Sequence, residues 1–551
     1  GEFVNESVHV TQTETLERGH IPPRFSRNKI YLWDFPRNSL QERPTVNDEI
    51  VRAINRGAVI LNYVGHGNPE LFAHERVFTL SADVPRLQNG AKLPLFFTAS
   101  CSIGFFDSPT AEGMAEELLR MDNGAIAVIS ATRLVYSSAN AEFNKVAFDQ
   151  MFSSQNLTMA QAVFAAKLSR QNTSGTQQND RRYSFFGDPY LRLAQPQHAV
   201  NISLDTDSLM ALQLSVVSGT VVDGSGQALT SFNGSALITI RDSRTTRNHK
   251  VLNAAGNVSA DMFYDVNGPI VFRGSAAVVS GAFTISFIPS LDIAFGGTDA
   301  GVSVYASSGD ADASGSLDSV TVGAAIPTTN DNTGPQISVN FGNRSSFSSG
   351  DPVTPGEIMR IGLYDTSGIN LSGGFGHNIT LIIDDEVTAE IDLTADFIYF
   401  PGSFRRGEIT HQLESLAPGD HTFNIKAWDN ANNSSTVEFS AEAVTGASAM
   451  EIRDLLNYPN PMTDNTGFYF TLMAPAERMS LQIFTLSGIK IYEASESNLA
   501  ASYHKDIFSW NGRDKDGDEV ANGVYLYRAV AYPSAGTGQI AEQFGKLVIN
   551  K

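Results

Sequence analysis

The fold of the first part of the chain is decided by two apolar runs, Ala58-Val59-Ile60-Leu61-Asn62-Tyr63-Val64 and Leu93-Pro94-Leu95-Phe96-Phe97-Thr98-Ala99-Ser100. Short, continuous apolar runs of this kind are typical of strands buried in a parallel sheet. The first run leads into Gly65-His66-Gly67, and the second leads into Cys101, the only cysteine of the 551-residue chain. Because the carboxyl ends of parallel strands face one crevice, we expect an imidazole and a thiol at the same sheet edge.

Cys101 and His66 are therefore the candidate catalytic pair. A free thiol has a pKa of about 8.5, so nucleophilic catalysis at neutral pH needs a neighbouring base or cation. His66 is the candidate base, and the backbone N–H groups of Gly67 and Cys101 are candidate donors to an oxyanion. A lone cysteine in an apolar run is often only a small buried hydrophobe, so the pair by itself leaves both interpretations open.

The sequence from Asn28 to about Leu193 alternates apolar runs with helical periods, which predicts an α/β domain. We expect strands at 30–34, 58–64, 93–100 and 125–130, and helices from Thr45 to Gly57, from Ser108-Pro109 to Asn123-Gly124, at 139–151 and at 158–169. Four strands are few for such a sheet, so the domain is expected to be incomplete. The chain starts at Gly1 without an initiator methionine, which predicts a longer precursor or an upstream fragment.

Beyond residue 200 the sequence alternates apolar and polar residues between Gly, Asp and Ser turns, which is typical of β-sandwiches. We expect an α/β domain over residues 1–198, then all-β modules of the immunoglobulin-like type at 199–330 and 331–445, and a last β-sandwich module at 451–551. Thr328–Pro335 and Val444–Met450 are the expected linkers.

Composition narrows the classes of partner. The formal net charge is −21 and no Lys/Arg cluster is present, so nucleic acid is not an expected partner. No run approaches the ~20 apolar residues of a membrane-spanning helix. The sequence shows no metal-ligand pattern and no cofactor motif. Residues Asp514-Lys515-Asp516-Gly517-Asp518 resemble the start of a calcium loop, but the later glutamate of such a loop is missing, so this segment predicts a hairpin turn.

Three segments resemble the gingipain-type cysteine peptidases: Asn62–Asn68, Phe97–Cys101 and Phe186–Leu193. The resemblance covers roughly residues 1–195 and implies a caspase-like fold, a Cys101/His66 dyad and substrate contacts from the loop 131–136, which contains Arg133. Asp107, six residues beyond Cys101, and Glu70, close after His66, are further candidate substrate contacts. His74 and Glu75 are candidates of the same kind, although residues in such a loop are more often simply solvated.

The last hundred residues resemble the sorting domains of type IX secretion cargo, through Asn457–Pro461, Trp510–Arg513, Asn522–Tyr527 and Lys546–Val548. Within the gingipain-type family, Gly65–Asn68 followed by His74–Val77 is most similar to the sortase group. That similarity implies removal of sorting domains from exported cargo and acyl transfer, through a thioester, to anionic lipopolysaccharide. It also implies outer-membrane partner proteins, with an upstream fragment of the precursor as a further expected partner, and peripheral attachment to the surface of a Gram-negative cell.

Two other functions stay open at this level. A secreted peptidase of the same fold that is itself cargo would lose residues 451–551 by cleavage at the linker. A catalytically inactive surface adhesin would keep the scaffold without the chemistry.

Overall fold

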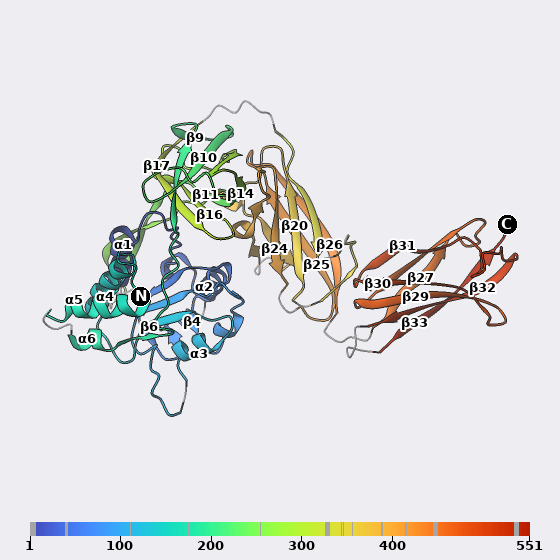
Figure 1. Cartoon of the computed structure of the whole chain (residues 1–551), viewed down its shortest axis with the longest axis horizontal. Helices are drawn as coiled ribbons and strands as arrows, with labels where there is room; N and C mark the ends of the chain where they lie inside the picture. The colour runs from blue at the N-terminus through green and yellow to red at the C-terminus, as the bar shows by residue number, and fades with distance from the viewer. Residues whose placement is uncertain are drawn as a thin grey trace.

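The computed structural model describes residues 7–551 with short internal gaps. The gaps are residues 39–41, 111, 173–176, 254, 325–330, 343, 345, 355, 387–389, 414–415, 445–449 and 534–538. The start of the chain lies outside the described residues, and so do parts of the two expected linkers. Figure 1 shows the α/β domain at one end, β-modules bent over it in the middle, and a C-terminal β-module extending away.

The α/β domain is built on a four-stranded sheet in the order β1-β5-β6-β7. Its strands are β1 (Ile60–Val64), β5 (Leu95–Ala99), β6 (Ala127–Ala131) and β7 (Tyr183–Phe186). β1, β5 and β6 run parallel, and β7 is antiparallel to β6. Every residue of β5 and β6 is buried, as expected for central strands covered on both faces. The three parallel strands confirm the strands expected from the apolar runs.

Helices and a small sheet cover the two faces of this sheet. Phe97 of β5 belongs to the core beneath α1 (Val8–His20), α4 (Ser137–Met151) and α5 (Met159–Arg170). Phe96, which points to the opposite face, belongs to the core beneath α2 (Pro44–Arg56) and α3 (Met114–Arg120). The small sheet lies on this second side and comprises β2 (Gly67–Asn68), β3 (Leu71–Phe72) and β4 (Phe78–Thr79). Short helices η2 (Val84–Arg86) and α6 (Gln177–Arg181) complete the domain.

Some local predictions are wrong. Residues 30–34 form no strand but contain the 3-10 helix η1 (Leu32–Asp34). The helix expected from Ser108-Pro109 begins only at Met114, where the Glu116 side chain accepts a hydrogen bond of 2.8 Å from Gly113 N. α2 begins at Pro44 rather than after a Thr45 cap, because proline needs no N–H donor at the first helical position. α1 and β7 were not expected.

The middle of the chain forms β-modules that share one sheet and one core. A 12-stranded sheet continues from the first module into the second through parallel pairing of Gly274 in β14 with Tyr399 in β23. A single hydrophobic cluster spans both modules. The strands of the first are β8 (His198–Leu204), β9 (Ser208–Met210), β10 (Ser215–Val222), β11 (Gly234–Arg241), β12 (Thr245–Leu252), β13 (Val258–Val266), β14 (Ile270–Val278), β15 (Ala282–Phe287), β16 (Ala300–Ser307) and β17 (Asp312–Gly323).

The second module adds a five-stranded sheet in the order β19-β26-β25-β21-β22. The strands of the whole second module, in both sheets, are β18 (Gln336–Phe341), β19 (Pro352–Val353), β20 (Ile358–Tyr364), β21 (Thr380–Ile383), β22 (Ile391–Asp392), β23 (Ile398–Tyr399), β24 (Arg406–Gln412), β25 (Gly419–Trp428) and β26 (Ser434–Ala443). The short helices η3 (Gly374–Gly376) and η5 (Thr394–Asp396) lie between them. The immunoglobulin-like type of these modules, and the boundary between them at residue 330, stay predictions.

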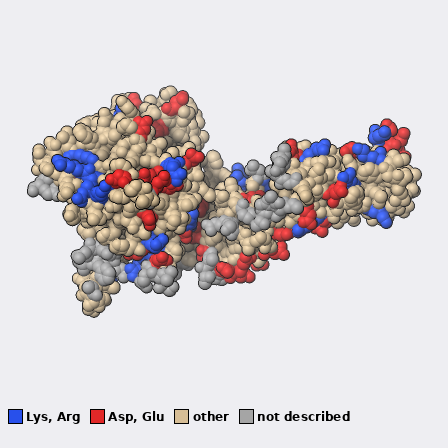
Figure 2. All heavy atoms as spheres, turned by 90° about the horizontal axis from the view of Figure 1, so that it is seen from below, with Lys and Arg blue, Asp and Glu red and all other residues tan. Residues whose placement is uncertain are grey.

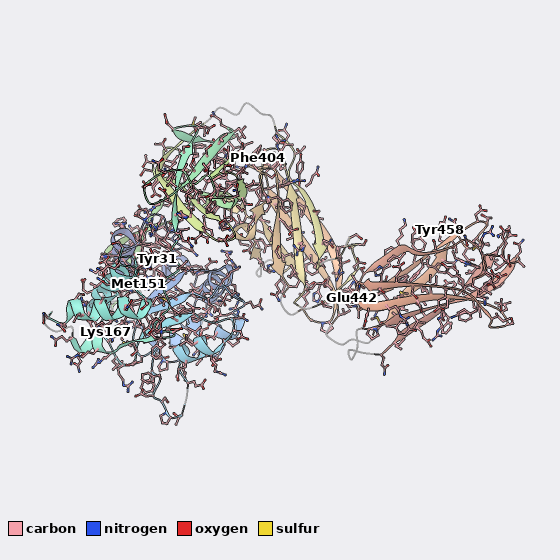
Figure 3. All side chains as sticks on the ribbon, in the orientation of Figure 1. Tyr31, Met151, Lys167, Phe404, Glu442 and Tyr458 are labelled. Carbon is pink, nitrogen blue, oxygen red and sulfur yellow. The ribbon has the colours of Figure 1, made fainter. Side chains whose placement is uncertain are left out.

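The C-terminal module is a sandwich of two sheets around its own core, which contains Phe468, Trp510 and Tyr527. Its strands are β27 (Ile452–Tyr458), β28 (Thr466–Leu472), β29 (Ala476–Thr485), β30 (Lys490–Leu499), β31 (Tyr503–Trp510), β32 (Gly523–Tyr532) and β33 (Ala541–Ile549). An ion pair of 2.8 Å between Arg453 and Glu442 ties it to β26, at the end of the second module (Figure 3).

The hairpin of β12 and β13 holds the α/β domain against the first β-module. Arg18 of α1 pairs with Asp265 at 2.6 Å, and the Tyr264 hydroxyl donates to Asp34 at 2.6 Å. Tyr31, at this junction in Figure 3, packs against Tyr264 with 4.8 Å between ring centroids. These polar and aromatic contacts fix the position of α1, which in turn borders the candidate site.

Two surface properties bear on function. Figure 2 shows acidic side chains gathered along the elongated middle of the molecule on the face viewed from below, in keeping with the net charge of −21. Among the described helices, none combines the length and the apolar character needed to cross a membrane.

Candidate active site

Cys101 and His66 follow neighbouring strands of the parallel sheet. β1 and β5 pair in a register that puts Val64 opposite Ala99, so each of the two residues lies two positions beyond the last pair. Neighbouring strands are about 4.8 Å apart, which keeps the two chain segments adjacent as they leave the sheet. The structure thus places both residues at one sheet edge, and their catalytic role stays a prediction.

The loop that carries His66 packs directly against the segment that carries Cys101. A methyl group added at Gly67 would lie 2.6 Å from Ser100 Oγ and 2.8 Å from Ile103 Cδ1, so this approach requires glycine. The His66 carbonyl accepts hydrogen bonds from Ala73 N at 2.8 Å and from the Tyr63 hydroxyl at 2.6 Å. These bonds fix the backbone of the loop and leave the imidazole exposed.

Two other imidazoles flank the His66 ring. The His74 ring stacks on it, with 5.3 Å between centroids and 15° between planes. The His9 ring of α1 meets it edge-on at 5.4 Å and 85°. Rings on two sides restrict how the His66 imidazole can turn. The sequence offered His74 only as a candidate substrate contact, and it gave no signal for His9, which belongs to an unexpected helix far upstream.

The Cys101 thiol is held by the loop after β6. Its Sγ donates to Val135 O at 3.4 Å and accepts from Val135 N at 3.5 Å. Among the hydrogen bonds of the described residues, none joins Sγ to the His66 ring. Ser102 has a φ of 54°, a left-handed backbone that non-glycine residues adopt rarely and that often marks functional sites. Behind the thiol, burial and the nearby Cys101 raise the pKa of Tyr183.

The other predicted contacts lie on the exposed rim. Arg133 and Asp107 pair with each other through two hydrogen bonds of 3.0 and 2.6 Å. Hydrogen bonding to Arg133 also lowers the pKa of Asp107. Glu70 is exposed, and its backbone N–H donates to Asn68 Oδ1 at 2.8 Å. The structure thus joins Arg133 with Asp107 near Cys101, where Ser102 N donates to Arg133 O at 3.3 Å, and it places Glu70 in the turn between β2 and β3.

A comparison with family models gave a match in this region. The model described as Peptidase family C25 matches residues 3–194. Residues 3–194, called the C25 domain below, are thus similar to peptidase family C25. The match contains both Cys101 and His66, and it ends where the β-modules begin. The resemblance to gingipain-type peptidases noted from three short segments is therefore confirmed for the C25 domain.

Solved structures supply further likenesses. The dimeric latent PorU of Porphyromonas gingivalis is 26% identical, with a TM-score of 0.31, and the match covers 77% of this chain and 41% of that one. The complex of the pro- and mature domains of Porphyromonas gingivalis RgpB is 18% identical, with a TM-score of 0.26, covering 51% and 57%. The chain thus spans less than half of the PorU chain that it matches. A search of curated proteins found no match.

Among the described residues outside the C25 domain, one group has the chemistry to hold a cation. Carboxylate oxygens of Asp331, Asp365 and Asp429 lie within 4.8 Å of one another, and the last two residues are buried. Carboxylate oxygens are ligands that Ca²⁺ prefers. The sequence did not indicate this group because its members come from three separate loops. The Asp429 side chain accepts hydrogen bonds from Asn433 N at 2.7 Å and from Asn433 Nδ2 at 2.8 Å.

This carboxylate cluster makes stability depend on pH. Burial raises the pKa of Asp429 from 3.8 to about 6, and repulsion from Asp365 and Asp331 adds to the shift. Because the folded state binds the proton more tightly, the stabilisation is complete below the unfolded pKa and is lost as the pH rises through about 6. We expect Asp429→Asn to raise the free energy of unfolding at pH 7.5 by on the order of 2 kcal/mol. The free energy of unfolding should also decrease less between pH 4 and pH 6.5 in Asp429→Asn than in the parent protein.

Chemical denaturation of the full chain, measured in EDTA so that no cation occupies the cluster, checks this expectation. Asp420→Asn is the matched control, since Asp420 is exposed on β25 of the same module. A destabilised Asp429→Asn protein at pH 7.5, with an unchanged control, would contradict the expectation.

Proposed function

We propose that the chain is a sortase-type cysteine peptidase that cleaves C-terminal sorting domains from exported cargo and attaches the cargo to anionic lipopolysaccharide. One observation carries the proposal: within the segment that matches peptidase family C25, the only cysteine and a histidine follow paired parallel strands to one edge of the sheet. The sorting-domain resemblance of residues 451–551 connects this chemistry with type IX secretion.

The reaction runs through a thioester on Cys101. His66 takes the thiol proton, the sulfur turns away from the Val135 carbonyl, which would repel a thiolate, and it attacks the carbonyl carbon before the sorting domain. The C–N bond then breaks as His66 returns the proton to the leaving amine. An amine of the acceptor attacks the thioester, loses its proton to His66 and releases the thiolate. Water in place of the amine would give simple hydrolysis.

The loop after β6 is the proposed contact for the acyl side of the substrate. It carries the Val135 hydrogen bonds to the thiol, and next to them Leu134 and Tyr136 are 71% and 70% exposed. Exposed apolar side chains of this size are typical of binding surfaces. Arg133, paired with Asp107, lies at the rim of the same loop.

Partners and location follow from the same proposal. The substrates are cargo proteins that carry type IX sorting domains, and the acceptor is an anionic lipopolysaccharide. Outer-membrane proteins of the secretion system would hold the enzyme peripherally at the cell surface. An upstream fragment of the precursor would complete the C25 domain.

The identity of the product tests the proposal. The full precursor, as cells produce it, is incubated with a cargo protein that retains its sorting domain and with hydroxylamine as a small amine. We expect a cargo product that has lost the sorting domain and carries a C-terminal hydroxamate in the intact mass. Cleavage that yields only a free carboxylate would overturn the sortase assignment and leave a peptidase, and no cleavage would overturn both.

The alternative, that the chain is itself processed cargo, is favoured by the separate core of the C-terminal module. The mass of the surface-bound protein separates the two functions, because a sortase retains residues 451–551 and a processed cargo protein loses them.

A further inference from the structure

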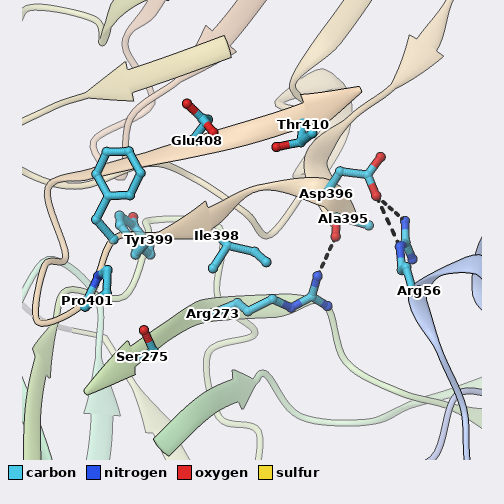
Figure 4. Close-up of a pocket in the computed structure, with 11 residues that line it drawn as sticks. Arg56, Arg273, Ser275, Ala395, Asp396, Ile398, Tyr399, Pro401, Glu408 and Thr410 are labelled. Atoms are coloured by element: carbon cyan, nitrogen blue, oxygen red, sulfur yellow. Dashed lines mark hydrogen bonds and ion pairs between the residues drawn. The ribbon is translucent and has the colours of Figure 1, made fainter. Parts of the chain in front are cut away.

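A cleft that does not include Cys101 lies where three parts of the molecule meet. Its volume is about 410 Å³. The C25 domain contributes Arg56, at the end of α2, to the lining of this cleft. The first β-module contributes Arg273 of β14, and the second β-module contributes residues between 395 and 410. Figure 4 shows the guanidinium groups of Arg56 and Arg273 at the same end of the cleft, beside Asp396.

Positive charge is in excess at this end. Arg56 Nε and Nη2 bond to Asp396 Oδ1 at 3.1 and 2.8 Å, and Arg56 Nη1 lies 4.0 Å from Glu49 Oε1. Arg273 Nη1 donates to the Ala395 carbonyl, and its Nε and Nη2 make no hydrogen bond within the described part of the chain. Glu408, also in the cleft, is already paired with Arg360 at 2.9 Å.

The protonation behaviour of the arginines supports this description. Burial lowers the pKa of Arg273 to about 10, and repulsion from Arg241 and Arg56 adds to the shift. Burial lowers the pKa of Arg241 as well, again with repulsion from Arg56. Attraction from Asp396 opposes the shift in the pKa of Arg273 only in part, and Arg273 makes no direct ion pair within the described part of the chain.

The opposite wall of the cleft is apolar. Ile398 and Phe400 are 45% and 40% exposed, and Pro401 also lines the cleft. Apolar lining with a few convergent polar groups is the usual character of a small-molecule site. A guanidinium with free N–H groups is suited to a phosphate or carboxylate, which it can bind through two parallel hydrogen bonds.

We propose that this cleft binds an oxyanionic group, phosphate or carboxylate, carried on a small body with an apolar face, such as a sugar ring. The oxyanion accepts from Arg273 and, in competition with Asp396, from Arg56, while the body lies against Ile398 and Phe400. Because Arg56 and Arg273 belong to different parts of the chain, the bound ligand links the C25 domain to the first β-module. This site goes beyond the proposed function and does not depend on it.

Calorimetric titration and thermal unfolding of the full chain test the proposal, with inorganic phosphate, glucose 6-phosphate, glucuronate and glucose as probes. We expect the three anions to bind and to raise the unfolding temperature, with glucose inactive. Arg273→Gln should weaken binding at least about tenfold, since it removes charge-assisted hydrogen bonds. Asp396→Asn should strengthen binding several-fold because it removes the competing carboxylate. Arg406→Gln, an exposed arginine of the same module, is the matched control.

The two variants should change the anion affinity in opposite directions. The Asp396→Asn measurement therefore keeps the test decisive even if Arg273→Gln folds poorly. Anions that act no better than chloride at equal ionic strength would overturn the proposal, as would an Asp396→Asn protein with unchanged affinity. A loss in Arg406→Gln equal to that in Arg273→Gln would overturn it too. Equal binding of phosphate and glucose 6-phosphate would support the oxyanion site and remove the role assigned to the apolar wall.

Discussion

Cys101→Ala should abolish cleavage of the sorting domain, with a loss of at least about 1000-fold in kcat/KM. The reason is that no other side chain at this sheet edge can form the thioester. The thiol lies two residues past β5, with the Val135 N–H 3.5 Å from its sulfur, and the described neighbours offer no second nucleophile of comparable strength. Cargo cleavage by the protein as cells produce it, followed as a change in intact mass, is the measurement.

The single cysteine allows a direct control. Iodoacetamide should add one carbamidomethyl group per chain and inactivate the enzyme in proportion, and the Cys101→Ala protein should take up none. An unchanged unfolding temperature separates loss of chemistry from loss of fold. If cargo still loses its sorting domain in the presence of the folded Cys101→Ala protein alone, the thioester mechanism is wrong.

The sequence correctly predicts those strands that are encoded by one continuous run of apolar residues. β1, β5 and β6 are of this kind, because a central parallel strand needs apolar residues on both faces. The segment at residues 30–34 has a similar sequence pattern, but none of the residues of η1 is buried. Trp33 stacks on His249 of the distant hairpin at 4.0 Å, and a sequence pattern cannot distinguish that contact from a place in the sheet.

α1 was missed for the opposite reason, since its buried face carries charge. Glu14 and Glu17 are both buried, and they pair with Lys29 at 2.9 Å and Arg27 at 2.6 Å. Buried carboxylates are tolerated only when such partners are in place, and these partners are recognisable only once the chain has folded. The site shows the same division: the strand ends predict where Cys101 and His66 lie, whereas the His9 ring reaches His66 through a helix that the sequence did not reveal.

His66→Gln should lower kcat/KM by about 100- to 10,000-fold, because the thiol loses its base and the leaving amine loses its proton donor. Glutamine keeps a planar polar group between the His9 and His74 rings but carries no titratable nitrogen. Combining His66→Gln with Cys101→Ala should cost little beyond Cys101→Ala alone, since residues that act as a unit are not additive. Iodoacetamide should also label Cys101 more slowly in His66→Gln at neutral pH, which reports thiolate formation without any substrate.

His421→Gln is the matched control for that labelling experiment. The His421 ring is bonded to Asp384 and to the Ala417 carbonyl, both at 2.6 Å, in the second β-module. The same chemical change there should leave cleavage and labelling unaltered, although it removes two hydrogen bonds. An unchanged unfolding temperature of the His66→Gln protein would exclude loss of fold as the cause of any change in labelling or cleavage. The result that contradicts the prediction is a His66→Gln protein that labels and cleaves as fast as the parent. Such a result would show that His66 is a neighbour of the thiol and not its base.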